Sequence, residues 1–389
     1  MKGNTIMQNN LTLEKLENFH EPVHTALPFL PPFQEYCDAI KHIWESNYLT
    51  NNGSLHQNFE QSLTEYLSVP FNSLFVNGHM ALDIAIKSLQ LTGEVITTPF
   101  TFASTTHAIY MNGLTPVFCD INDDDYTMDV TKIEKLITER TSAIIPVHVF
   151  GHPCDVYEIE RIAKKYNLTV IYDAAHAFGV KINECAIGNF GDISMFSMHA
   201  TKVFHSIEGG LLTYDDENLR DVFQQYKNFG ISGPENVERV GLNAKMNEFQ
   251  AAMGILNLKY ITEEIEKRKK ITKIYREKLK DIPGIRYIEE KQNIQYNYSY
   301  FSIEINECEY GLNRDQLHEK LKQYNVFTRK YFYPLTSDFA CYNKQFDSWE
   351  TPIAKQIANQ ILILPLYGSL PIKDAEKICM MIKEFPRNT

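Results

Sequence analysis

The 389-residue chain lacks the features that mark several specialised classes of protein. No apolar run approaches the ~20 residues that a transmembrane helix needs, so we expect no membrane partner. Residues 1–20 are polar and carry no signal-peptide pattern. The seven cysteines are scattered and include no CxxC pair. We therefore expect neither a disulfide framework nor a metal site, and we place the protein in the reducing cytoplasm.

Positive charge is also in short supply. Lysine and arginine number 38 against 49 aspartates and glutamates, which gives a formal net charge of −11. Nucleic-acid binding needs a basic surface, so this composition predicts no nucleic-acid partner. An anionic ligand held in one local pocket is still compatible with it.

The chain does have the composition of a large globular protein. Hydrophobic residues make up 44% and charged residues 22% of it, and we find no internal repeat or low-complexity tract. From residue 73 onward, short runs rich in β-branched and aromatic residues alternate with helical patterns. We expect strands at 74–76, 95–98, 115–119, 143–149, 169–172 and 193–197, with helices at 80–91, 103–112, 130–137 and 156–166. This alternation predicts an α/β fold with a mostly parallel sheet between helices.

The sequence divides into three parts. Residues 1–30 are polar and irregular and form a predicted N-terminal arm. Residues 31–262 form the predicted large domain, with further helical patterns at 33–44 and 56–67. A helical pattern at 247–258 is followed at 263–280 by dense mixed charge, which is typical of a solvated helix face. Residues 263–389, with a strand at 300–305 and helices at 314–324 and 372–385, form a predicted smaller α+β domain.

Two charged residues follow predicted neighbouring strands. Ligands of an open α/β sheet bind beyond the carboxyl ends of its strands. Asp173 follows the strand at 169–172 among small apolar residues, and it could hold a metal, a ribose hydroxyl or a protonated ring nitrogen, or cap a helix. Lys202 follows the next strand among apolar residues. Desolvation there would favour the neutral amine that forms Schiff bases, although a lysine can also extend to solvent.

Two further signals suggest a phosphate and a flat ring. Asn77, Gly78 and His79 open the helix after the strand at 74–76, where backbone N–H groups can face an anion, and Ser197 adds a hydroxyl nearby. A lone Asn-Gly pair is otherwise a turn. Phe100 or Phe102, after the strand at 95–98, would supply a stacking face, or would belong to the core.

Together these signals describe the requirements of pyridoxal 5′-phosphate (PLP). An acid keeps the pyridine nitrogen protonated, a lysine forms a Schiff base, an anion site takes the phosphate and an aromatic ring stacks on the cofactor. No single signal is specific, but the four occur in one order along one predicted sheet edge.

At this point the sequence resembles the DegT/StrS family of nucleotide-sugar aminotransferases, which are fold-type-I PLP enzymes. The resemblance covers roughly residues 30–385, and its segments are 146–151, 172–179, 197–202 with 208–210, and 241–252. It implies a large PLP-binding domain with a seven-stranded sheet, a smaller C-terminal domain and a homodimer. The presence of lysine at 202, where related sugar dehydratases carry histidine, favours transamination.

The resemblance also assigns roles to individual residues. Lys202 matches the internal-aldimine lysine and proton shuttle, and Asp173 matches the partner of the pyridinium nitrogen. The other matching positions are His176 near the phenolic oxygen, Phe102 and Ala175 on the two ring faces, Ser197 at the phosphate, and Asn243, which reaches the phosphate from the neighbouring subunit. His79 departs from the family, which often has threonine there. Either the imidazole contacts the phosphate or PLP binds somewhat more weakly.

The resemblance further implies L-glutamate as donor and a keto-sugar nucleotide as acceptor. Segments 27–32, 49–53, 93–99 and 199–204 resemble family members that aminate a 4-keto-6-deoxy sugar, which points to dTDP-4-keto-6-deoxyglucose and to dTDP-4-amino-4,6-dideoxyglucose as product. Arg329 is our candidate for an anionic substrate group, with Tyr333 and His107 as further contacts. The alternatives are amination at C3, a non-catalytic regulatory protein of the PLP fold, and an α/β sugar-nucleotide-binding protein without PLP.

Overall fold

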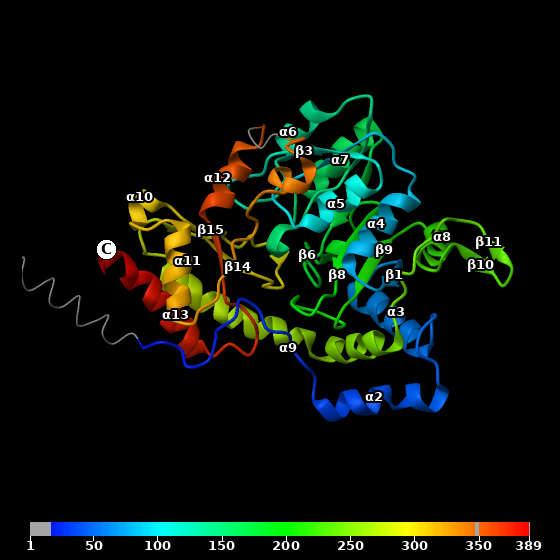
Figure 1. Cartoon of the computed structure of the whole chain (residues 1–389), viewed down its shortest axis with the longest axis horizontal. Helices are drawn as coiled ribbons and strands as arrows, with labels where there is room; N and C mark the ends of the chain where they lie inside the picture. Colours follow the sequence, from blue (N-terminus) through cyan, green and yellow to red (C-terminus); the bar gives the residue numbers. More distant parts are fainter. Residues whose placement is uncertain (1–16, 347–349, 389) are drawn as a thin grey trace, which may run out of the picture.

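The computed structural model describes residues 17–346 and 350–388. A seven-stranded sheet forms its centre, in the order β1-β9-β8-β5-β4-β2-β3 (Figure 1). The strands are, in that order, Phe71–Phe75, Gly210–Tyr214, Ile193–Ser197, Thr169–Asp173, Thr141–Ile144, Glu94–Thr97 and Thr115–Phe118. The five strands from β8 to β3 pair in parallel, whereas β9 runs antiparallel to both β8 and β1. Strands β1, β8, β5, β4, β2 and β3 therefore end at the same edge of the sheet.

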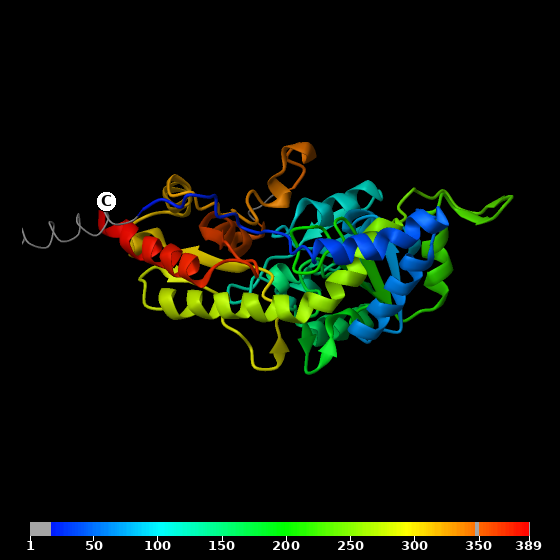
Figure 2. The same cartoon turned by 90° about the horizontal axis from the view of Figure 1, so that it is seen from below.

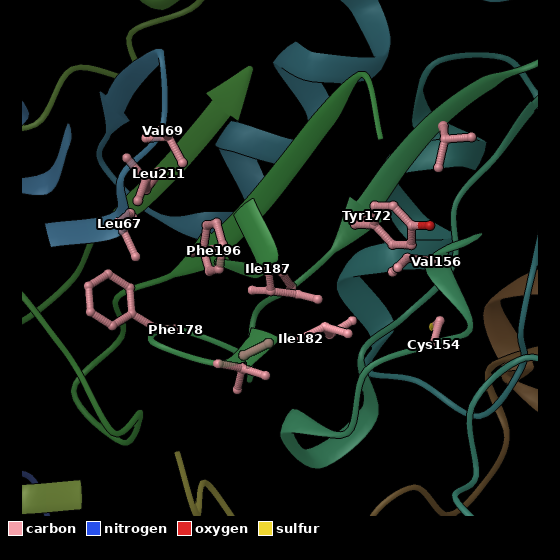
Figure 3. Close-up of a cluster of buried hydrophobic side chains, with 14 of the residues drawn as sticks. Leu67, Val69, Cys154, Val156, Tyr172, Phe178, Ile182, Ile187, Phe196 and Leu211 are labelled. Carbon is pink, nitrogen blue, oxygen red and sulfur yellow. The ribbon is translucent and has the colours of Figure 1, made fainter. Parts of the chain in front are cut away.

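Helices cover both faces of this sheet, because its strands are apolar on both sides. Helices α4 (Gly78–Ser88), α5 (Ala103–Met111) and α8 (Asn218–Lys227) share one buried apolar cluster with one face. Helices α3 (Ser54–Leu67), α6 (Val130–Ile133) and α7 (Val156–Tyr166), with part of α9 (Glu248–Leu279), share a second cluster with the other. In Figure 3, Tyr172 and Phe196 of the strands point into this second cluster with Leu67 and Val156 of the helices.

Helix α9 connects this core to a second one. Its 32 residues begin at a capping box in which the Asn247 side chain accepts from the Gln250 backbone and the Gln250 side chain accepts from that of Asn247. Ala251 near its start belongs to the core around the sheet, and Tyr275 and Leu279 near its end belong to the second core. Figure 2 shows the helix running along the length of the molecule.

The second core lies in the C-terminal part of the chain. Strands β12 (Ile285–Arg286), β14 (Phe301–Ile305) and β15 (Ile361–Leu364) form an antiparallel sheet, against which α11 (Arg314–Gln323) and α13 (Ile372–Glu384) pack. The arm contributes to this core as well, because Phe19 and Val23 are buried in it and Val23 pairs with Val326. Among the described residues, the other α-helices are α2 (Phe33–Ser46), α10 (Glu307–Tyr310) and α12 (Pro352–Gln360).

The predicted α/β fold with a mostly parallel seven-stranded sheet is confirmed. Strand β8 and helix α7 have the predicted bounds, and the other predicted helices and strands differ mainly at their ends. The predicted strand at 143–149 was too long: it spans Thr141–Ile144, because Pro146 has no N–H to donate and Phe150 adopts a left-handed backbone with φ of 56°. The two helical patterns at 247–258 and 263–280 form the single helix α9, which runs through the proposed domain boundary at residue 262.

The proposed parts 1–30 and 263–389 include residues outside the described ones, namely 1–16, 347–349 and 389. Within the described ranges, no helix has the length and apolar character needed to cross a membrane.

Candidate active site

The predicted site residues meet at the shared edge of the sheet, around a cavity of about 470 Å³. Strands β1, β2, β5 and β8 end here, and the chain after each strand supplies part of the wall. Ten of the predicted residues line the cavity: Asn77, Gly78, His79, Phe102, His107, Asp173, Ala175, His176, Ser197 and Lys202. Residues far apart in the sequence thus converge on one pocket, as expected for the carboxyl edge of an open α/β sheet.

Asp173 ends strand β5 and is only 4% exposed. Its Oδ2 accepts a 2.6 Å hydrogen bond from the Thr105 hydroxyl, and its Oδ1 accepts one of 3.1 Å from the Ala175 backbone N–H. Burial raises the pKa of Asp173, while these two hydrogen bonds and the charge of Lys202 lower it. A buried carboxylate is stable as an anion only beside positive charge. Its fixed position therefore suits a cationic ring nitrogen.

Lys202 lies in the loop after strand β8, where its backbone N–H donates to the carbonyl of His199. Burial lowers the pKa of its amine to about 8, although the charge of Asp173 and that of Tyr331 act in the opposite direction. The Nζ atom lies 5.9 Å from the centre of the Tyr300 ring. A pKa near 8 leaves an appreciable neutral fraction at physiological pH, and only the neutral amine attacks a carbonyl group.

The hydrogen bonding of His176 defines where its proton sits. The backbone N–H of Phe150 donates to its Nδ1 at 3.1 Å. Burial and the nearby charge of Lys202 hold the pKa of His176 well below its usual range, so the ring is neutral. Because Nδ1 accepts a hydrogen bond, the single proton is on Nε2. His176 lines the cavity, and its Nε2–H is a donor that suits a phenolate oxygen.

An anion site is formed by the start of α4 and the end of β8. The Asn77 side chain caps the helix by accepting from the Met80 N–H at 2.9 Å, so the amides of Gly78 and His79 begin the helix without intrahelical acceptors. A Cβ on Gly78 would lie 3.0 Å from the Ser197 Cβ, so a larger residue would crowd the serine. The His79 Nδ1 is 2.8 Å from the Ser104 hydroxyl. These helix-start amides with a serine hydroxyl fit a phosphate group.

Two residues form candidate faces for a flat ring. Phe102 is the N-cap residue of α5 and keeps 56% of its surface exposed although it is aromatic. Ala175 follows Asp173 and adds a small apolar side chain to the cavity wall. An exposed aromatic ring at a cavity wall is typical of a stacking site. PLP, with its ring nitrogen, phenolic oxygen and phosphate, fits the groups that these residues offer.

Three predicted residues do not line this cavity. Arg329 lines an adjacent cavity, which shares Thr201, Tyr300 and Tyr331 with the first. Tyr333 is half-exposed beneath the Arg314 guanidinium, 4.7 Å from its Cζ. Asn243 is exposed, and its Oδ1 accepts a 3.0 Å hydrogen bond from Lys245. For Asn243 the prediction concerned the neighbouring subunit, so its distance from its own pocket does not contradict that prediction.

Several wall residues were not predicted from the sequence. Tyr300, Tyr331 and Phe332 come from the C-terminal part, and Thr101 precedes α5. His107, which was predicted, is held by a 2.8 Å contact between its Nδ1 and the Tyr342 hydroxyl. The segment 328–334, which contains two of these wall residues, carried a signal, since Arg329 and Tyr333 were selected from it. Which of its rings faces the cavity depends on how the two cores meet, and a sequence pattern does not encode that.

Among the described residues, no three histidine, cysteine, aspartate or glutamate side chains come together as metal ligands could. The cavity chemistry is instead that of a carboxylate, an amine, an imidazole and an anion cradle.

Comparison with known proteins agrees with this geometry. The DegT/DnrJ/EryC1/StrS aminotransferase family matches residues 33–383. The chain belongs to this family of aminotransferases. It is 41% identical over 364 residues to the dTDP-4-amino-4,6-dideoxy-D-glucose transaminase of Shigella dysenteriae. The matched residues cover 94% of this chain and 99% of the relative. It is 43% identical over 358 residues to a transaminase of the same name from Escherichia coli, and the match covers 91% of this chain and 96% of that relative.

A solved structure has the same fold. The crystal structure of DesI in the presence of its TDP-sugar product superimposes with a TM-score of 0.91 at 30% sequence identity, covering 98% of each chain. The predicted family and the predicted class of enzyme, a sugar aminotransferase, are therefore confirmed.

Proposed function

We propose that this aminotransferase moves the amino group of L-glutamate to C4 of dTDP-4-keto-6-deoxyglucose, using PLP and giving dTDP-4-amino-4,6-dideoxyglucose. The observation that carries the proposal is the presence of a buried carboxylate, Asp173, and a partly buried amine, Lys202, in one cavity beside an anion cradle. The two bacterial transaminases described above carry the name of the proposed product, which supports the choice of sugar.

The cofactor would be held at both ends. PLP, when bound, supplies an aldehyde that condenses with amines and a ring that withdraws electrons while its nitrogen is protonated. Asp173 would hold the ring nitrogen, and Ser197 with the first amides of α4 would hold the phosphate. The Nε2–H of His176 would donate to the phenolic oxygen. Phe102 and Ala175 would face the two sides of the ring.

Lys202 is the proposed acid and base. Its pKa of about 8 lets Nζ accept a proton from the donor carbon and return a proton to the acceptor carbon at neutral pH. Tyr300 and the buried Phe332 line the cavity around this amine and reduce its contact with water. Donor and acceptor react one after the other at the same site, next to the Lys202 amine. We therefore expect ping-pong kinetics.

We further propose a homodimer in which Asn243 completes the phosphate site of the neighbouring subunit, and a location in the cytoplasm. Asn243 is exposed on the chain that follows the hairpin β10 (Ile231–Gly233) and β11 (Asn236–Val237), which projects from the body in Figure 1. Val237 and Val240 are largely exposed there. Exposed apolar side chains on a projecting segment are typical of a surface that a partner covers.

The proposed location in the cytoplasm is supported by the seven cysteines, all of which are free. Free cysteines are typical of proteins in a reducing compartment.

The test is a panel of dTDP-3-keto and dTDP-4-keto sugars, each incubated with the PLP-loaded protein and L-glutamate. NMR of the product locates the new amine, and the amount of 2-oxoglutarate reports turnover. We expect amination at C4 of the 4-keto-6-deoxy sugar. A C3 amine would overturn the regiochemistry, and a protein that never converts glutamate would be a regulatory member of the fold rather than an enzyme.

A further inference from the structure

A second cavity of about 470 Å³ lies against the one that holds Asp173 and Lys202. The two share Thr201, Tyr300 and Tyr331, so the two tyrosines form part of a common wall. Three other segments complete it: the arm at 24–26, helix α11 with His318 and Lys322, and the stretch 327–329. The arm is fixed there, because the Thr25 hydroxyl donates to the Phe327 carbonyl at 2.7 Å.

The charge of this second cavity is unusual for an acidic protein. Its described lining residues include no aspartate or glutamate, whereas two carry a positive charge, Lys322 and Arg329, and two are histidines, His24 and His318. The first cavity, by contrast, contains the carboxylates of Asp173 and Glu208. The second cavity is thus a local basic site on a chain with a net charge of −11.

Arg329 is held in a position suited to an anion. Its backbone pairs with Ile363, with hydrogen bonds of 3.2 and 2.8 Å in the two directions, so the main chain is anchored to β15. Its guanidinium lies 5.6 Å from the centre of the Tyr331 ring. No carboxylate of the described residues forms an ion pair with it. A planar guanidinium stacked on an aromatic ring is pre-organised for bidentate contact with phosphate oxygens.

Lys322 can contribute a second positive charge. Its Nζ is 3.9 Å from Glu319, and both side chains are more than half exposed, so the pair is weak and the lysine is free to turn. The His318 Nδ1 is fixed 2.7 Å from the Thr328 hydroxyl. On the opposite side, the His24 ring stacks on Phe327 with 5.7 Å between ring centres.

We infer that this basic cavity binds the pyrophosphate of the sugar nucleotide, with Arg329 and Lys322 as its main contacts. The inference rests on the proposed function and adds the residues that select a nucleoside diphosphate. In a 4-keto sugar nucleotide, the phosphates are attached across the ring from the carbon that receives the amine. The two cavities have the matching arrangement, with Lys202 on one side of the Tyr300 and Tyr331 wall and Arg329 on the other.

The amino donor is the competing occupant, and its chemistry places it elsewhere. In glutamate the α-carboxylate is attached to the same carbon as the reacting amine, so it must stay close to Lys202. Glutamate also has no aromatic or sugar portion to fill a second cavity of this size. The side-chain carboxylate of glutamate is a single anion at the end of a short chain, whereas the basic cavity offers both a lysine and an arginine. Two cations match the pyrophosphate of the acceptor better than one carboxylate of the donor.

Separate half-reactions test the inference. The PLP form is mixed with L-glutamate alone, and the pyridoxamine form with dTDP-4-keto-6-deoxyglucose alone, while the cofactor absorbance is followed. We expect Arg329→Gln and Lys322→Gln each to weaken the apparent affinity for the sugar nucleotide about tenfold to a hundredfold, the usual effect of losing a hydrogen bond to a charged group. The glutamate half-reaction should change less than about twofold, which also shows that each variant is folded.

Lys330→Gln is the matched control. It removes the same charge from the next residue, but the Lys330 amine pairs with Asp315 and does not line the cavity. It should leave both half-reactions unchanged. A loss confined to the glutamate half-reaction in Arg329→Gln would assign the cavity to the donor and overturn the inference. Variants that bind the sugar nucleotide like the wild type would overturn it as well.

A measurement on the wild type keeps the test independent of any variant. dTDP and thymidine are compared as inhibitors of the sugar-nucleotide half-reaction. We expect dTDP to inhibit at least about tenfold more strongly than thymidine, because only dTDP carries the charged group. Equal inhibition would contradict a pyrophosphate site. If the wild type converts neither glutamate nor the keto-sugar, the proposed function itself is wrong, which is a different outcome.

Discussion

The Lys202 amine owes its chemistry to burial. Its surroundings lower the amine pKa to about 8, whereas Asp173 acts to raise it. A protonated lysine cannot attack an aldehyde, so the pKa sets the pH range in which the residue reacts. Burial therefore converts an ordinary basic side chain into a nucleophile near neutral pH.

This leads to a pH prediction for the cofactor-free protein. Labelling of Lys202 by acetic anhydride, followed by peptide mass spectrometry, should rise with pH and reach half its maximum near pH 8, since only the neutral amine reacts. In Asp173→Asn the half-maximum should move to lower pH, because the charge that favours the protonated amine is gone. A half-maximum near 10.4, the value of a solvated lysine, would refute the account of burial.

Thr105 is a predicted positioning residue for Asp173. Its hydroxyl donates a 2.6 Å hydrogen bond to the Asp173 Oδ2 and lies 2.8 Å from the Thr101 hydroxyl. Thr105→Val keeps the shape but removes the donor, so PLP affinity should fall about tenfold or more, as expected for a hydrogen bond to a charged group. PLP titration measures this affinity, and the absorbance of the bound cofactor reports the ring environment.

Thr106→Val is the control for Thr105→Val. Thr106 is also buried in α5, but its hydroxyl donates to Thr336 and not to Asp173. It should lose some stability and keep its PLP affinity. Equal PLP affinity in both variants would show that the Thr105 hydroxyl does not support the carboxylate.

Residues at strand ends were the predictable part of the site. Asp173 and Ser197 end parallel strands that lie side by side, so the sheet rule alone brings them together. Thr105 was missed because a threonine inside a helix gives no signal of its own. Tyr300 and Tyr331 were missed because their place depends on packing between the two cores, which local periodicity does not report.

At the scale of elements, α9 stabilises another helix as well as connecting the two cores. Helix α3 begins after Gly53, which has no side chain to cap it. The Glu248 carboxylate of α9 accepts from the Leu55 N–H at 2.9 Å and from the His56 N–H at 3.1 Å instead. A negative charge at a helix start is also favoured by the helix dipole. The cap of α3 therefore comes from a residue 192 positions away from His56.

Gly53→Ala should destabilise the protein. A Cβ at residue 53 would lie 2.5 Å from the Glu248 Cδ, so the carboxylate would have to leave the two amides. We expect the free energy of unfolding to fall by about 1–3 kcal/mol, the usual cost of overpacking a fixed site. Chemical denaturation measures the change.

Gly233→Ala serves as the comparison for Gly53→Ala. Its added Cβ would meet only the Asn236 side chain, at 4.0 Å. This substitution should change the free energy of unfolding by less than about 0.5 kcal/mol. Equal effects at the two glycines would show that the close approach of Glu248 to residue 53 is unimportant.

Elements with one strong periodicity were predictable, and elements shaped by tertiary contacts were not. Helix α7 and strand β8 were found with their bounds, since each has a clear pattern and clear ends. Strand β9 was missed, although its antiparallel pairing with β8 and β1 completes the sheet. The alternation of strands and helices predicts parallel strands only, so it does not reveal a strand that joins the sheet antiparallel to its neighbours.

The whole molecule has features that a second copy would explain. Phe33 and Trp44 of α2 are largely exposed, as are Val237 and Val240 near the hairpin. Helix α2 contacts the long helix α9 and lies at the outside of the body in Figure 1. Large exposed apolar side chains on two peripheral elements favour a subunit interface.

Shared active sites predict complementation between two defective subunits. Lys202→Ala removes the amine of its own site, and Asn243→Ala removes the proposed contact to the partner's cofactor. In a mixed dimer one site carries both defects and the other carries neither. Subunit exchange in an equal mixture should therefore restore about a quarter of the wild-type activity. A mixture no more active than its components would place Asn243 outside the shared site.

The most direct test of the central claim is borohydride reduction of the PLP-loaded protein, with and without prior exposure to L-glutamate. We predict that reduction fixes PLP on the peptide containing Lys202, and that glutamate added first prevents this by converting the cofactor to its amine form. Mass spectrometry reads both results. PLP fixed on another lysine, or fixed on Lys202 equally well after glutamate, would contradict the account.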